Sequence, residues 1–79
     1  MIITKGDLCV VSNPWGAVGH ACDPSVWQKL GSGNYYVRTL FSIKNGEIII
    51  VLESSSADVL AMTTMGIVVI ARAYISNEF

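Results

Sequence analysis

Charged side chains are scarce in this sequence. Only 14% of its 79 residues are Asp, Glu, Lys or Arg, whereas an average soluble domain has about 25%. The five basic residues are scattered along the chain, so they form no cluster of the kind that neutralises phosphates. The net charge is −1, and the acidic residues are equally dispersed. Nucleic acid is therefore not an expected partner.

Cysteine and histidine are also rare. The two cysteines, Cys9 and Cys22, are too few for a disulfide scaffold, and no CxxC or HxxxH spacing is present. His20 is the single histidine, so a metal site would have to use a Cys9, His20 and Cys22 cluster with three good ligands. The ordinary interpretation, a core cysteine beside an accessible histidine, is favoured. We expect no cofactor.

Catalytic motifs are absent from the sequence. It contains no Walker, GxGxxG or GxSxG pattern. A cysteine nucleophile would depend on His20 alone, and general acid–base chemistry would fall to Asp23, Glu53 or Glu78. These groups do not complete a catalytic site, so we expect a protein that is not an enzyme.

The sequence also lacks a long apolar run. Its longest uncharged stretch near the end, "VLAMTTMGIVVIA", has thirteen residues between Asp58 and Arg72, whereas a membrane-spanning helix needs about 20. The first residues, "MIITKGDL", have no apolar segment after a basic start, so no signal peptide is expected. We expect a cytoplasmic protein with reduced thiols and no membrane span.

Apolar residues, in contrast, make up 52% of the chain. A chain of this length predicts one small domain, residues 1–79, which buries only about 60% of its unfolded surface. Some of the apolar surface is then expected to lie in an interface. We therefore expect a homo-oligomer, a dimer or higher.

The segment 34–54 predicts a β-hairpin. Asn45-Gly46 is a favoured pair for a two-residue type I′ turn. That turn would pair Lys44 with Glu47 and would bring Arg38 opposite Glu53. In this register one face forms the core, made of Tyr35, Val37, Phe41, Ile43, Ile48, Ile50 and Leu52.

The other face of the same predicted hairpin carries Leu40, Ile49 and Val51. A strand that is apolar on both faces is usually covered on both. In so small a chain the second cover would be a short helix or another copy of the protein. We interpret these three residues as a self-association surface.

The flanking segments predict short elements. Residues 7–22 read as two strands joined by a type I turn at 13–16, which places Cys9 opposite His20. "DPSVWQKLG", residues 23–31, predicts one or two helical turns, because Asp suits the cap and Pro the first helical position. Residues 57–65 predict a short helix that stops at Gly66, with an irregular loop as the alternative. Residues 67–71 predict a strand from their β-branched content.

The two ends of the chain resemble SH3-like small β-barrels. "KGDLCVV" is similar to the first strand of the KOW-type and SH3-like barrels, and "PWGAVGHAC" to the turn and second strand that follow. "VIARAYISNEF" resembles the SH3 ending, in which a strand runs into a 3₁₀ turn and then a Tyr and an aliphatic residue, here Tyr74 and Ile75. Ala71 replaces the usual proline, and the paired tryptophans of peptide-binding SH3 domains are missing. The resemblance therefore does not imply binding of proline-rich peptides.

Aromatic residues provide the best candidates for partner binding. Trp15 lies at a turn tip, where the backbone demands no large side chain, and exposed tryptophans are common interface anchors. Its alternative role is to fold back and close the end of the barrel. Trp27, Tyr36 and Arg38 would add an outward stacking surface. With so little basic charge around them, a protein is the favoured partner.

The sequence thus predicts a mainly β, SH3-like barrel of about five strands with one or two short helices; the alternative is an α+β fold in which a short helix covers a hairpin sheet. Its expected function is that of a small protein-binding module that self-associates, in the style of a phage or mobile-element accessory protein acting on a host factor. A KOW-type nucleic-acid-binding barrel and a small metal- or ligand-binding protein are the alternatives.

Overall fold

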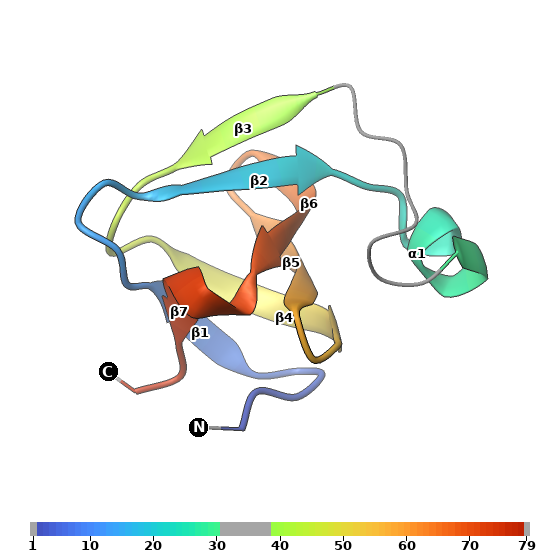
Figure 1. Cartoon of the computed structure of the whole chain (residues 1–79), viewed down its shortest axis with the longest axis horizontal. Helices are drawn as coiled ribbons and strands as arrows, with labels where there is room; N and C mark the ends of the chain where they lie inside the picture. The colour runs from blue at the N-terminus through green and yellow to red at the C-terminus, as the bar shows by residue number, and fades with distance from the viewer. Residues whose placement is uncertain (1, 31–38, 79) are drawn as a thin grey trace.

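The computed structural model describes residues 2–30 and 39–78. Within these ranges the chain is mainly β, with seven antiparallel strands, one short helix and one 3₁₀ turn (Figure 1). In chain order the elements are β1 (Leu8–Val11), β2 (Ala17–Ala21), α1 (Pro24–Leu30), β3 (Leu40–Ile43), β4 (Ile48–Ser54), β5 (Asp58–Thr63), β6 (Gly66–Ala71), the 3₁₀ turn η1 (Arg72–Tyr74) and β7 (Ile75–Ser76). The predicted mainly β fold with a short helix is confirmed, although the described sheet has seven strands where we expected about five.

The strands form one sheet that curls into a half-barrel. Their order is β3-β2-β6-β5-β4-β1-β7. β4, β5 and β6 are consecutive antiparallel neighbours, whereas β1 lies between β4 and the short β7. The two ends of the described chain lie on the same side of the molecule (Figure 1), where the Asn77 side-chain amide donates a hydrogen bond of 2.6 Å to the Ile2 carbonyl.

The inside of the half-barrel holds the main core. Because side chains alternate along a strand, every second residue of the central strands points inward. β1, β4, β5 and β6 each contribute two such buried side chains: Cys9, Val11, Ile49, Val51, Val59, Ala61, Val68 and Ile70. Ile3, Ala17, Ile43 and Ile75 close this core at its ends.

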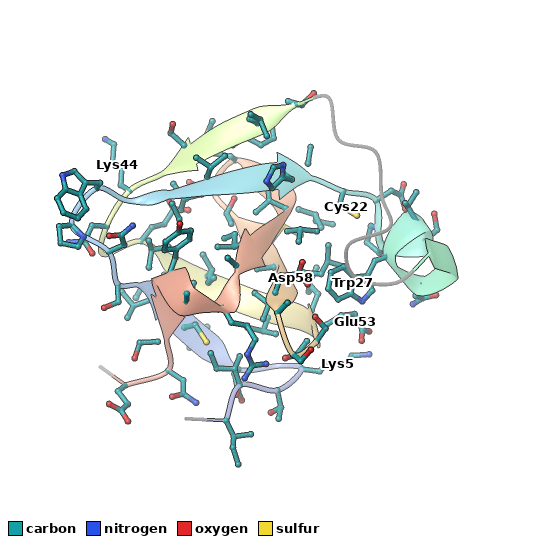
Figure 2. The ribbon with its side chains drawn as sticks, in the orientation of Figure 1. Lys5, Cys22, Trp27, Lys44, Glu53 and Asp58 are labelled. Carbon is teal, nitrogen blue, oxygen red and sulfur yellow. The ribbon has the colours of Figure 1, made fainter. Side chains whose placement is uncertain are left out.

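A second, smaller cluster lies on the outer face of the same sheet. Leu60 and Val69 point outward from β5 and β6, yet neither is exposed, because Trp27 of α1 packs on them. Cys22, Leu52 and Ile67 are packed around this group. Figure 2 shows Trp27 projecting from α1 toward the sheet. A short helix thus covers part of one sheet face, but not the predicted one: the covered face carries Leu52, which we expected in the core, whereas Ile49 and Val51 of the predicted second face lie in the main core.

Helix α1 begins as the sequence predicts. The Asp23 carboxylate Oδ1 accepts hydrogen bonds from the Ser25 backbone N–H at 2.8 Å and from the Ser25 hydroxyl at 2.7 Å. Pro24 occupies the first helical position, where its missing N–H costs no hydrogen bond. The cap confirms the predicted start of the helix. No helix in the described ranges is long and apolar enough to cross a membrane.

The predicted hairpin between β3 and β4 is wrong. β3 pairs with β2, and β4 pairs with β1 and β5. The turn exists, since the Glu47 N–H donates to the Lys44 carbonyl at 3.1 Å, but only Gly46 has a positive φ, of 89°. A type I′ turn needs a positive φ at Asn45 as well, whereas a positive φ at the third position alone is typical of type II. Such a turn splays the strands that it joins.

The missing pairing reverses the faces of β4. Ile49 and Val51 are fully buried in the core, whereas Ile48 and Ile50 are 49% and 45% exposed. Leu40 is exposed on the edge strand β3. Leu40, Ile49 and Val51 therefore do not form the predicted self-association surface. Pairing with β1 and β5 turns the odd-numbered residues of β4 toward the core.

The predicted helix at 57–65 is also wrong, because this segment forms β5. Ser55 and Asp58 are spaced as in a helix capping box, but here Ser55 closes the turn between β4 and β5. Its N–H donates to the Asp58 carbonyl at 2.9 Å, and its hydroxyl donates to Asp58 Oδ1 at 2.9 Å. The break at Gly66 is confirmed, since Thr63 and Gly66 close the β5–β6 hairpin. The predicted strand at 67–71 lies within β6.

The turn predicted at 13–16 is confirmed, but the two strands that it joins do not pair with each other. The Gly16 N–H donates to the Asn13 carbonyl at 2.8 Å. β1 pairs with β4 and β7, so Cys9 lies opposite Ile49, and His20 lies between Leu40 and Val69. Cys9 and His20 are therefore not neighbours across a hairpin.

Candidate binding groove

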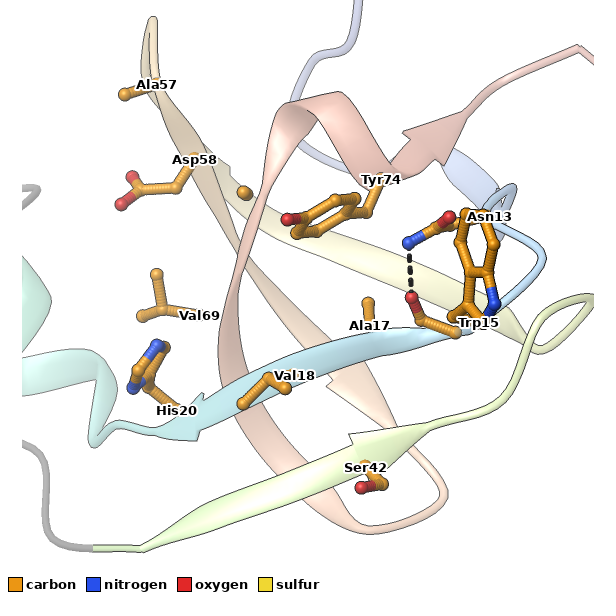
Figure 3. A pocket seen from close by; sticks show the side chains of 12 residues that line it. Asn13, Trp15, Ala17, Val18, His20, Ser42, Ala57, Asp58, Val69 and Tyr74 are labelled. Atoms are coloured by element: carbon orange, nitrogen blue, oxygen red, sulfur yellow. Dashed lines mark hydrogen bonds between the residues drawn. The ribbon is translucent and has the colours of Figure 1, made fainter.

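An open groove lies between β2 and the β6–η1 segment (Figure 3). β2 pairs with β6 only through His20 and Ala21, and from Ala17 to His20 it pairs with β3. From Ala17 to Gly19, β2 has no strand partner on the β6 side among the described strands, so β2 and β6 diverge there. The resulting groove has a volume of about 670 Å³.

Aromatic side chains stand at one end of this groove. The Trp15 indole projects from the 13–16 turn and the Tyr74 ring comes from η1, with Asn13 between them (Figure 3). Apolar side chains of Ala17, Val18, Val69 and Ala71 also line the groove, together with the hydroxyl of Ser42. Val69 lies beside His20 and Asp58, away from the two aromatic rings (Figure 3). The groove is thus partly apolar and has two aromatic rings at one end.

Trp15 is 91% exposed. Its turn is held by side-chain amides, since Asn13 Nδ2 donates to the Gly16 carbonyl at 2.6 Å and the Asn13 N–H donates to Asn45 Oδ1 at 3.1 Å. Gly16 has a φ of 77°, and an added Cβ would collide with the Ile43 carbonyl. The backbone therefore presents the indole to solvent from a fixed turn. The alternative in which Trp15 folds back to close the barrel is wrong.

Polar side chains stand at the other end of the groove. His20 and Asp58 line it there, and Asp58 accepts a hydrogen bond from the Ser55 hydroxyl. No lysine or arginine is among the described lining residues. Arg72 follows β6 directly, but its Nη1 donates to Ser54 Oγ at 2.7 Å and to the Ser55 carbonyl at 2.8 Å. The groove is therefore neutral to acidic.

Two of the four predicted partner-binding residues lie in the described part of the chain. Trp15 is at this groove, whereas Trp27 is 7% exposed and packs into the second cluster. Tyr36 and Arg38 lie outside the described residues. Trp27 therefore does not face outward as predicted, because the sheet face beneath α1 is apolar and its indole packs there.

The predicted metal candidates are not brought together. Cys9 is buried in the main core, His20 lines the groove and Cys22 packs beside Trp27. Across the described part of the chain, no three His, Cys, Asp or Glu side chains are grouped so that they would hold a metal ion.

Neither thiol is tuned for reactivity. Burial raises the pKa of Cys9, and the charge of Asp7 adds to this effect. Burial also raises the pKa of Cys22, and the neighbouring Asp23 carboxylate raises it further. A thiol with a raised pKa has little thiolate near neutral pH and is a poor nucleophile or metal ligand.

Sequence reasoning missed most of this groove. Tyr74 was noted only for its place at the end of the chain, and Val18 and Asn13 only as part of a strand and a turn. Their common position depends on how β2 diverges from β6, which no local pattern contains. The single available signal was a tryptophan at the tip of a well-formed turn.

Comparison of the chain with protein-family models, with curated proteins and with solved structures finds no match in any of the three. The residues and their geometry therefore carry the functional argument.

Proposed function

We propose that this protein is a non-enzymatic binding module that holds an extended segment of a partner protein in the groove between β2 and η1. The main support for this proposal is the solvent exposure of the Trp15 side chain. A large apolar ring held out in water on a fixed turn gains free energy when a partner covers it, and tryptophan is among the residues most enriched in binding hot spots.

The shape of the groove favours an extended chain. The six residues from Trp15 to His20 span about 17 Å when extended, which matches an extended segment of about six residues. Its small apolar side chains leave room for the partner's own side chains. Apolar groups of the partner would pack near Trp15 and Tyr74, and the His20 and Asp58 end would receive a polar group.

Charge argues against the nucleic-acid alternative. Lys5 is already paired with Glu53 at 3.4 Å, and Arg72 is bound to Ser54 and Ser55. A phosphate backbone depends on several basic contacts, and the described groove residues supply none.

We also propose that the half-barrel is related to the SH3-like small barrels. The support is at the end of the chain, where β6 runs into the 3₁₀ turn Arg72–Tyr74 and Ile75 follows directly, which is similar to the ending that the resemblance implies.

A displayed library of random short peptides tests the proposed function. We expect wild-type protein to enrich peptides whose affinity falls about tenfold or more for Trp15→Ala. Met65→Ala is the matched control, because Met65 is an exposed apolar residue in the β5–β6 turn and does not line the groove. Amide shifts on peptide addition should move at Val18, His20 and Ala71. Peptides that bind Trp15→Ala as well as they bind wild type would contradict the proposal.

A further inference from the structure

The strand β2 is paired on one side along most of its length and on the other side only at its end. On the β3 side it is paired from Ala17 to His20. On the β6 side only His20 and Ala21 have partners. The first part of β2 thus has one edge without a strand partner among the described residues, and this edge forms a wall of the groove.

The hydrogen bonds of the sheet show which β2 backbone groups point to that edge. Along a strand, successive residues direct their N–H and carbonyl to opposite sides, so alternate residues bond to the same neighbour. The Ala21 N–H donates to the Thr39 carbonyl at 3.0 Å, on the β3 side. The Cys22 N–H donates to the Ile67 carbonyl at 3.3 Å, on the β6 side. Even-numbered residues of β2 therefore point toward β6, and Val18 is the one that lies in the unpaired part.

The neighbouring backbone groups on the same edge of β2 are already used. The Gly16 N–H donates to the Asn13 carbonyl at 2.8 Å, and the Gly16 carbonyl accepts from Asn13 Nδ2 at 2.6 Å. His20 is paired with Val69 of β6. Among the described residues of β2, Val18 therefore offers an N–H and a carbonyl that face the groove without a strand partner there (Figure 3).

The opposite wall of the groove has the same arrangement. The Arg72 N–H, directly after β6, donates to the Ala57 carbonyl at 3.1 Å, so even-numbered residues bond toward β5 at this point. Ala71 therefore points its N–H and carbonyl toward β2, and it lines the groove. Continuing the register of the β2–β6 ladder would place Ala71 opposite Val18, but the ladder ends before that pair. Both walls thus present main-chain donors and acceptors to the groove.

We propose that the partner segment of the proposed function, on which this inference rests, binds as an added β-strand whose backbone pairs with the N–H and carbonyl of Val18. Unpaired strand edges bind extended polypeptide segments in this way. A polypeptide backbone has both a donor and an acceptor to offer, whereas an apolar small molecule would leave both groups of Val18 unpaired. Pairing at Val18 fixes the alignment of the segment, and Trp15 and Tyr74 contact its side chains at one end.

Amide hydrogen exchange measured by NMR tests this pairing, with Gly19 as the internal control. In the free protein the Val18 amide should exchange about tenfold or more faster than the Gly19 amide, because Gly19 points to β3. A peptide that wild-type protein selects from the displayed library should slow exchange at Val18 by about tenfold more than at Gly19. Equal protection of the two amides in the free protein, or equal slowing in the complex, would overturn the added strand.

An amide-to-ester scan of the same selected peptide separates backbone pairing from side-chain contacts. Each ester removes one peptide N–H and keeps every side chain, so one position should weaken binding by about tenfold. In the protein, Val18→Pro removes the N–H, and proline is tolerated in a strand where that N–H has no ladder partner. It should weaken binding about tenfold more than Val18→Ala, which keeps the N–H. Should Val18→Pro fail to fold, the ester scan with the wild-type protein still decides.

The outcomes distinguish this inference from the proposed function. Peptides that depend on Trp15 but bind equally well with every ester would overturn the added strand and leave the proposed function intact. The same holds if Val18→Pro binds them as well as Val18→Ala does. A library that yields no peptide dependent on Trp15 would overturn both.

Discussion

Leu60 and Met62 are two residues apart on the same face of β5, yet Leu60 is fully buried and Met62 is 41% exposed. Both are apolar, and both belong to a central strand. The difference lies above the sheet, where Trp27 covers Leu60 and no described residue covers Met62 in the same way. An apolar strand face therefore does not reveal by itself whether it belongs to the core.

The length of the covering helix explains where the cover ends. α1 has seven residues and is about 10 Å long, whereas the six residues of β5 span about 20 Å. One short helix with one large indole can shield only part of such a sheet. The remaining apolar surface, formed by Leu8, Ile48, Ile50 and Met62, stays between 41% and 54% exposed.

Among the variants considered, Trp27→Ala should lower the free energy of unfolding the most. Removing the indole exposes Leu60 and Val69 and should lower the free energy of unfolding by about 3–5 kcal/mol, a large part of the stability of a small domain. Trp15→Ala is the control, since it removes an equally large ring from an exposed turn and should change stability by less than about 0.5 kcal/mol. Chemical denaturation measures both. Equal losses would mean that Trp27 does not protect the outer face.

The pair Leu60→Ala and Met62→Ala should give a clear but smaller contrast. Leu60→Ala leaves a cavity beneath Trp27 and should cost about 2–5 kcal/mol, whereas Met62→Ala should cost less than about 1 kcal/mol. Urea unfolding at a protein concentration low enough to keep the chain monomeric measures the two costs. If Met62→Ala lowers the free energy of unfolding as much as Leu60→Ala does, Trp27 does not make Leu60 more buried than Met62.

At acidic pH the packing of α1 and Trp27 on Leu60 and Val69 should loosen slightly. The hydrogen bonds from the Ser25 hydroxyl and then from its backbone N–H lower the pKa of Asp23. Because the folded-state pKa is lowered, the cap stabilises α1 above the unfolded pKa, about 4, and this contribution is lost as the pH falls through the lowered value. In a Trp15→Phe background, Trp27 emission should shift to the red in that range.

Asp23→Asn is the matched control for this acid effect. An amide oxygen still accepts the Ser25 hydrogen bonds but does not titrate, so the shift should disappear. A shift of the same size in Asp23→Asn would show that another group causes it.

Features encoded by a few adjacent residues were predictable. The Asp23–Pro24 helix start, the 13–16 turn and the break at Gly66 all follow from local backbone preferences, and the structure contains each of them. Short-range chemistry could still mislead, because the Asp58 N–H donates to Ser55 Oγ at 3.3 Å in this β-turn, as it would at a helix cap.

Strand pairing was not predictable in the same way. The Asn45-Gly46 pair suggested that β3 and β4 are neighbours, and every pair in that register was chemically reasonable. The Gly46 N–H instead donates to the Val11 carbonyl, and the Val11 N–H donates to the Glu47 carbonyl. β4 therefore lies between β1 and β5. With these neighbours Ile49 and Val51 are buried, so the predicted self-association surface is absent.

The sequence alone determined that this chain is mainly β, with one capped helix, few charges and more apolar side chains than one small core requires. The tertiary structure decided which strands pair, which face of β4 is buried, where Trp27 goes and where the groove opens. The physical reason is that turns and caps depend on neighbouring φ and ψ angles and single hydrogen bonds, whereas strand pairing and covering depend on contacts between segments far apart in the chain.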